Sequence, residues 1–170
     1  MKEKLYSLIA NQVRCYHSAV NEEWRRKHEY ALESLMKHMP SGSGIDAGTK
    51  LLLSESNENK LVFKVEYHHM NGGGYYCGWT TRNIIITPSL INGYNMEFEF
   101  ISNDADFTEI VVDEETGEEL EEDNSEFAIE STDDYLADTF RYALEQEYEL
   151  TLADYEPTKL TWHGELVLTN

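Results

Sequence analysis

The sequence predicts an α+β fold, in which an antiparallel sheet of four to five strands carries a long N-terminal helix, or a helical hairpin, and a second amphipathic helix in the C-terminal half. Two changes of pattern predict it. Apolar residues recur every three or four positions near the N-terminus, alternate with polar residues in the middle of the chain, and return to helical spacing after residue 131. The 170 residues suffice for one domain, residues 1–170, with a single hydrophobic core.

The first predicted element is a helical arm over residues 1–39. Residues 3–39 contain neither Gly nor Pro. Apolar side chains follow one another on a helical face: Leu5, Ile9, Val13, Tyr16, Val20 and Trp24. A break near Asn21 would turn the arm into a helical hairpin. Pro40 and the SGSG run at 41–44 end the helical segment, because proline removes a backbone donor and glycine favours open backbone.

Residues 50–102 are predicted to form the antiparallel sheet. The segment LVFKVEYHHM, residues 61–70, alternates apolar and polar side chains in the manner of a half-buried strand. The glycine run at 72–74 and the Asn-Gly pair at 92–93 are turn signals, so we expect the strands beside them to pair as hairpins. A last alternating run, residues 158–169, is the predicted closing strand.

An acidic insertion, residues 103–130, follows the predicted sheet. Residues 113–123 (DEETGEELEED) contain eight acids in eleven positions and no apolar period. That composition indicates a loop, a hairpin tip or a disordered segment.

A helix is predicted over residues 131–150, with Ser131 or Thr132 as its N-cap. Asp133 and Asp134 would then lie in the first turn, where negative charge interacts favourably with the helix dipole. The predicted apolar face consists of Leu136, Phe140, Ala143 and Leu144. The opposite face would carry a nearly straight acidic stripe made of Asp134, Asp138, Glu145 and Glu149.

The net charge of the chain is concentrated in one segment. Residues 104–156 hold 21 of the 33 acidic residues and one of the 13 basic residues, Arg141, so this segment accounts for the whole net charge of −20. Such a surface repels nucleic acid and anionic membranes, and its natural partners are cationic. Two interpretations remain open: an insertion that only solvates the protein, and a surface that imitates the charge of nucleic acid.

The sequence also favours a cytoplasmic location. No apolar run approaches the roughly 18 residues of a membrane span, and the N-terminal segment lacks the continuous apolar stretch of a signal peptide. Cys15 and Cys77 form neither a disulfide framework nor a CxxC pair, as expected in a reducing compartment. We expect no cofactor.

His68 and His69 are the obvious candidates for a metal site. Neighbours on a strand point to opposite faces, so both rings cannot reach one ion, and we expect no metal centre. Glu66 shares a face with His68, and Cys77 can approach either histidine across the glycine hairpin, as a thiolate and an imidazole would in catalysis. Packing is the simpler interpretation, and we expect no catalytic residue.

Four motifs carry a resemblance: PSGSGIDAGT at 40–49, VEYHHMNGGGYYCGWT at 65–80, IIITPSL at 84–90 and DDYLADTFRYAL at 133–144. These motifs resemble those of a family of small phage and mobile-element proteins, and the resemblance covers about half of the chain. The acidic insertion departs from the commoner pattern. The resemblance implies a protein of the host bacterial cytoplasm that looks like an anti-defence factor, of which the anti-CRISPR inhibitors of Cas9-type nucleases are the best-known acidic class.

We therefore expect a non-enzymatic inhibitor that binds a Cas9-type effector with its guide RNA and blocks DNA binding or cleavage, because carboxylates pair well with the basic residues that hold DNA. The alternatives are an inhibitor of another DNA-binding defence enzyme such as a restriction nuclease, a small phage enzyme using His68, His69 and Cys77, or an acidic interaction module. The candidate binding residues are acids of the predicted helix and of the insertion: Asp133, Asp134, Asp138, Glu145, Glu149, Glu114, Glu115, Glu118, Glu119, Glu121 and Glu122.

Overall fold

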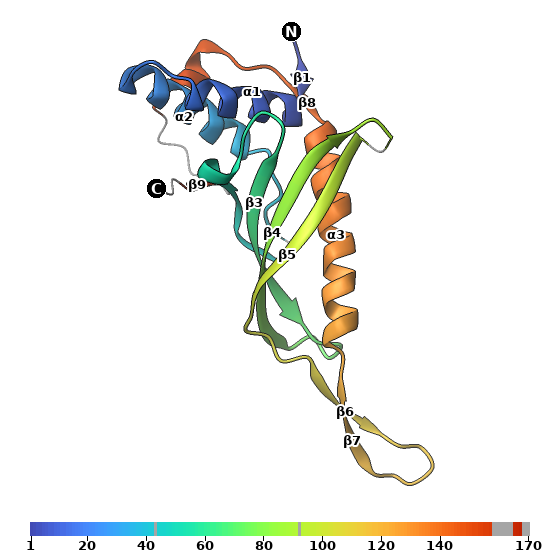
Figure 1. The fold of residues 1–170 in the computed structure, drawn as a ribbon. Helices are drawn as coiled ribbons and strands as arrows, with labels where there is room; N and C mark the ends of the chain where they lie inside the picture. The colour runs from blue at the N-terminus through green and yellow to red at the C-terminus, as the bar shows by residue number, and fades with distance from the viewer. Residues whose placement is uncertain (43, 92, 158–164, 168–170) are drawn as a thin grey trace.

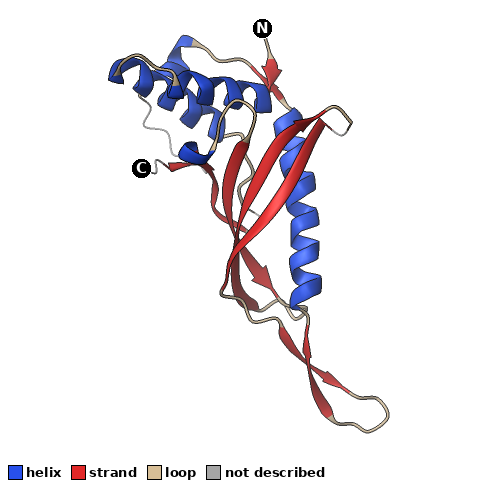
Figure 2. Ribbon diagram, in the orientation of Figure 1, coloured by secondary structure: helices blue, strands red, loops and turns tan. Residues whose placement is uncertain are grey.

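The computed structural model describes residues 1–42, 44–91, 93–157 and 165–167. In Figure 1, one long helix runs along a face of the main sheet, two helices lie across one end of it, and a narrow hairpin projects from the other end. Figure 2 shows the same layers by type of structure. The described elements are β1 (Glu3–Lys4), α1 (Leu5–His17), α2 (Glu22–Met36), β2 (Ile45–Leu52), η1 (Leu53–Glu55), β3 (Leu61–Met70), β4 (Tyr76–Ser89), β5 (Gly93–Asn103), β6 (Thr108–Val112), β7 (Glu119–Asp123), α3 (Ser125–Glu145), β8 (Glu147–Tyr148), η2 (Leu152–Tyr155) and β9 (Glu165–Val167).

Of the two forms expected for the N-terminal arm, the structure shows the helical hairpin, with the break between His17 and Glu22. Asn21 is the N-cap of α2, and its side-chain oxygen accepts a hydrogen bond of 2.9 Å from the backbone N–H of Trp24. The predicted apolar stripe is buried at Leu5, Ile9 and Val13, but Val20 and Trp24 are exposed because the chain turns between the two helices.

The main sheet has the strand order β5-β4-β3-β2-β9. Its first four strands pair antiparallel, which confirms the predicted α+β class with an antiparallel sheet. β9 differs from the expectation because it pairs parallel with β2. Alternation predicts a strand but not its direction, and a long connection of this kind allows a parallel pair. Of the predicted closing strand 158–169, residues 158–164, 168 and 169 lie outside the described residues.

α3 covers the sheet with the apolar face that its sequence predicts. Leu136, Phe140 and Leu144 are fully buried, and the Phe140 ring meets the Phe63 ring of β3 edge-on at 5.7 Å between centroids. These side chains join the buried stripe of α1 in one hydrophobic core. In the part of the chain that the structure describes, no helix is both long and apolar enough to cross a membrane.

The predicted boundaries of this helix, 131–150, were wrong at both ends. α3 begins six residues earlier, where the Asp123 carboxylate accepts a 2.9 Å hydrogen bond from the backbone N–H of Ser125. Neither Ser131 nor Thr132 is the N-cap. Thr132 lies buried inside the helix and donates its hydroxyl to the Ala128 carbonyl at 2.7 Å. The helix ends at Glu145, and the chain then pairs with the N-terminal strand as β8.

The acidic insertion contains the narrow hairpin, which we call the acidic arm: β6, β7 and the turn between them, residues 108–123. It projects away from the body of the molecule (Figure 1). The Asp113 carboxylate accepts a 2.8 Å bond from the Glu115 backbone N–H, and Gly117 supplies the positive φ of 72° that the turn requires. Of the three forms expected for this segment, the structure shows a hairpin tip.

Candidate functional site

The acidic arm exposes all six glutamates predicted from the insertion. Three lie in its turn and three on β7: Glu114, Glu115, Glu118, Glu119, Glu121 and Glu122. In the part of the chain that the structure describes, no lysine or arginine forms an ion pair with any of them. The arm therefore presents uncompensated negative charge to solvent.

The arm also exposes aliphatic side chains. Ile110 of β6 lies opposite Glu121, and Val112 lies opposite Glu119, so each pair shares a face of the hairpin. The side chains of Ile110 and Val112 are 67% and 58% exposed. A partner that covers this face would contact carboxylates from one strand and aliphatic groups from the other.

The base of the arm is tied to the sheet. Phe107 is buried, and its ring meets the ring of His69 edge-on at 4.9 Å between centroids. Glu109 accepts hydrogen bonds from the Asn124 side-chain amide at 3.1 Å and, at a longer 3.4 Å, from the Gly72 backbone N–H. These contacts join the arm to α3 and to the β3–β4 turn.

A second acidic row runs along α3, and it differs from the predicted one. Glu126, Glu130, Asp134 and Asp138 follow one another at steps of four residues, and all four are exposed. Asp138 lies 4.0 Å from Arg141. Sequence reasoning missed Glu126 and Glu130 because it began the helix at residue 131. The four-residue spacing that continues back from Asp134 was the signal that could have found them.

Glu145 and Glu149 do not extend this row, so the predicted stripe is wrong at its C-terminal end. Glu145 binds the Lys4 ammonium at 2.7 Å, and this hydrogen bond lowers the pKa of Glu145. Glu149 lies beyond the end of α3 and binds the N-terminal ammonium of Met1 at 2.7 Å, which lowers the pKa of Glu149. Both carboxylates already have cationic partners within the chain.

Asp133 lies inside α3, not in its first turn, and its side chain faces the sheet. Its carboxylate lies 2.9 Å from Nε of Arg82, whose side chain is only 1% exposed. Burial lowers the pKa of Arg82 and raises the pKa of Asp133, while each charge opposes the shift of the other. Asp133 is therefore part of the packing between α3 and β4 and contributes little to the outer acidic surface.

The two histidines lie on opposite faces of β3, as their adjacency predicted. His68 Nε2 lies 3.1 Å from a Glu66 oxygen, and His68 Nδ1 lies 2.8 Å from the Tyr76 hydroxyl. The His68 ring is also stacked near Trp79, at 5.9 Å between centroids. Within the described residues, no three His, Cys, Asp or Glu side chains are grouped as metal ligands would be.

His69 and Cys77 do not form a nucleophile–base pair. The Cys77 thiol donates to the His69 carbonyl oxygen at 3.4 Å, and His69 Nε2 bonds the Thr80 hydroxyl at 2.6 Å. Burial raises the pKa of the Cys77 thiol and lowers the pKa of His69 to about 4. The thiol is protonated and the imidazole neutral near pH 7, so this geometry supplies no activated thiolate.

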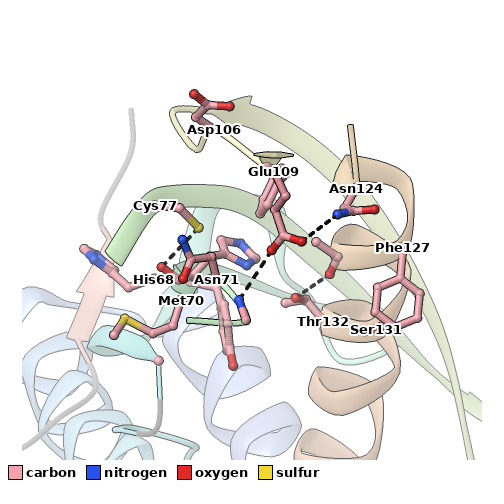
Figure 3. A pocket seen from close by; sticks show the side chains of 16 residues that line it. His68, Met70, Asn71, Cys77, Asp106, Glu109, Asn124, Phe127, Ser131 and Thr132 are labelled. Carbon is pink, nitrogen blue, oxygen red and sulfur yellow. Dashed lines mark hydrogen bonds between the residues drawn. The ribbon is translucent and has the colours of Figure 1, made fainter. Parts of the chain in front are cut away.

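A cavity of about 620 Å³ lies between the end of the β3–β4 hairpin, the base of the arm and the first turns of α3. Figure 3 shows Glu109 between the β3–β4 turn on one side and Asn124 on the other, with Phe127 on α3 beside Asn124. The cavity lies where the acidic arm joins the acidic row of α3. Its lining could not be found from the sequence, because it brings together residues 44 to 132 from five separate segments.

No known protein family, curated protein or solved structure matches the chain. The resemblance to phage and mobile-element proteins therefore stays a prediction.

Proposed function

We propose that the protein is a binding inhibitor that attaches to the cationic nucleic-acid site of another protein, with a Cas9-type effector as the favoured target. The observation that supports this best is the acidic arm, whose exposed glutamates have no cationic partner among the described residues. The acidic row of α3 continues the same charge along the body of the molecule. The proposal places the protein in a host bacterial cytoplasm, where such effectors act.

The charge density of the arm supports competition with DNA. Each strand of the arm has five residues, or about 17 Å, and the eight acids of residues 113–123 lie along that length and the turn. Four of these acids lie on β7, so this strand carries one charge per roughly 4 Å, near the spacing of about 3.4 Å between the phosphates of one DNA strand, and the turn adds four more. A basic groove built to hold a nucleic acid backbone would therefore attract the arm over a long range and exclude DNA from the same place.

The experiment compares two variants with the same net charge. In the neutral-arm variant the six arm glutamates become glutamine: Glu114, Glu115, Glu118, Glu119, Glu121 and Glu122. In the control variant six exposed glutamates outside the arm and α3 become glutamine: Glu23, Glu55, Glu58, Glu97, Glu99 and Glu156. Binding to guide-loaded Cas9 and inhibition of target binding and cleavage are measured for both.

We expect the neutral-arm variant to bind at least about tenfold more weakly, because six exposed ion pairs at a few tenths of a kcal/mol each exceed 1.4 kcal/mol together. The control should stay within about threefold of the native protein. Equal loss in both variants would mean that only overall charge matters. If no Cas9 binds, the same pair of variants is carried to restriction nucleases, the alternative target class.

A further inference from the structure

The cavity at the base of the acidic arm has the chemistry of a cation site. Its volume of about 620 Å³ falls in the range of ligand-binding pockets, and its sixteen lining residues include Asp106 and Glu109 but no Lys or Arg. His69, which also lines it, is neutral near pH 7 because burial lowers its pKa to about 4. An anionic ligand would therefore meet the Glu109 carboxylate and no Lys or Arg, whereas a cation would be attracted.

The two carboxylates are held in place. Glu109 is fixed between the Asn124 amide and the Gly72 backbone N–H, and it keeps acceptor capacity beyond these two bonds. Asp106 accepts a 2.9 Å hydrogen bond from the Thr108 backbone N–H, which lowers the pKa of Asp106 and keeps it ionised. Its carboxylate points away from the other lining side chains (Figure 3), so Glu109 is the carboxylate that faces the cavity. A positioned carboxylate can bind a guanidinium through two parallel hydrogen bonds.

Aromatic rings complete the lining. Phe107 and Tyr67 come from the base of the arm and from β3, and Phe127 comes from the first turns of α3. Phe127 is 75% exposed, which places an apolar ring at the accessible side of the cavity. Rings beside carboxylates favour arginine over lysine, because a planar guanidinium stacks on a ring while it bonds a carboxylate.

We propose that this cavity seats an arginine side chain of the cationic partner, with the guanidinium on Glu109 and the stem against Phe127. The identity of the partner rests on the function proposed above. The arm would then supply long-range attraction, and the cavity would supply a fixed point of attachment at its base.

The test titrates the labelled full-length protein with N-acetyl-arginine amide and, separately, N-acetyl-lysine amide, and follows backbone amide shifts by NMR. We expect saturable shifts around the cavity, with the arginine compound binding about fivefold more tightly than the lysine compound. Glu109→Gln and Phe127→Ala should each weaken arginine binding by about fivefold. Glu118→Gln, which removes the same charge from the arm turn, should change it by less than about twofold.

Three results would overturn the proposal: shifts that do not saturate, equal binding of the two compounds, or an effect of Glu118→Gln as large as that of Glu109→Gln. If Glu109→Gln disturbs the fold, Phe127→Ala still tests the site, because the Phe127 ring is mostly exposed and its removal should leave the fold intact. No partner protein takes part in the titration, so its failure leaves the arm proposal standing. The proposed function can also fail by itself. If the cavity binds arginine but the neutral-arm variant still inhibits Cas9 fully, the proposed function is wrong and the arginine site stands.

Discussion

Replacing Asp133 by asparagine should destabilise the protein strongly, because it leaves the Arg82 guanidinium buried without its countercharge. Arg82 is 1% exposed, its Nε lies 2.9 Å from Asp133, and its two terminal nitrogens have no hydrogen-bond partner among the described residues. Breaking a buried ion pair from one side costs about 3–5 kcal/mol. The Asp133 side chain is 29% exposed, so we expect the lower end, about 3 kcal/mol.

The assay is urea unfolding of the native protein, Asp133→Asn and the neighbouring Asp134→Asn, with the free energies of unfolding compared at pH 7. Asp134 is exposed, and its variant should stay within about 0.5 kcal/mol of the native value. Adding Arg82→Met to Asp133→Asn should recover most of the loss, because no buried charge then lacks a partner. A cost below about 1 kcal/mol for Asp133→Asn would refute the reasoning.

Two further predictions concern the end of the sheet near the cavity. The pKa of His69 is lowered to about 4 by burial, so the unfolded chain binds a proton that the folded protein resists. Stability should be fully present above about pH 6.5 and fall as the pH drops toward 4, and urea midpoints at pH 7 and pH 5 should differ less in His69→Gln than in the native protein. Gly78→Ala should cost more than about 2 kcal/mol, because Gly78 has a φ of 117° and an added Cβ would collide with the Asp104 carbonyl oxygen and lie 2.6 Å from Cα of Ala105. Thermal unfolding of Gly78→Ala is compared with that of Gly74→Ala. Gly74 also has a positive φ but has open space around it, so its alanine variant should lose clearly less stability. Equal losses of stability in the two alanine variants, or an unchanged pH dependence in His69→Gln, would contradict these expectations.

The regular elements could be predicted because their signals are local. The possible break near Asn21 and the alternation in residues 61–70 depend on neighbours within a few positions, and both lead to the observed elements. The start of α3 could not be placed in the same way. The expected N-caps, Ser131 and Thr132, lie inside the helix, and the hydrogen bond from the Ser125 N–H to Asp123 that marks the observed start follows an acid-rich run without an apolar period.

The roles of the acidic residues depended on packing between distant segments. Asp133 and Asp134 are adjacent in sequence, yet one binds the buried Arg82 of β4 and the other faces solvent. Glu145 and Glu149 are bound by Lys4 and by the N-terminal ammonium, more than a hundred positions away. Charge composition therefore predicted the acidic surface as a whole, while the partition into exposed and paired acids required the tertiary structure.

The most direct test of the central claim measures binding of the native protein to guide-loaded Cas9 over a series of salt concentrations, with and without target DNA. We predict that affinity falls steeply as salt rises, that the neutral-arm variant has both a lower affinity and a shallower salt dependence, and that bound target DNA prevents binding. Binding that is independent of salt and unaffected by the neutral-arm substitutions, or a complex that forms equally well on DNA-bound Cas9, would contradict the account.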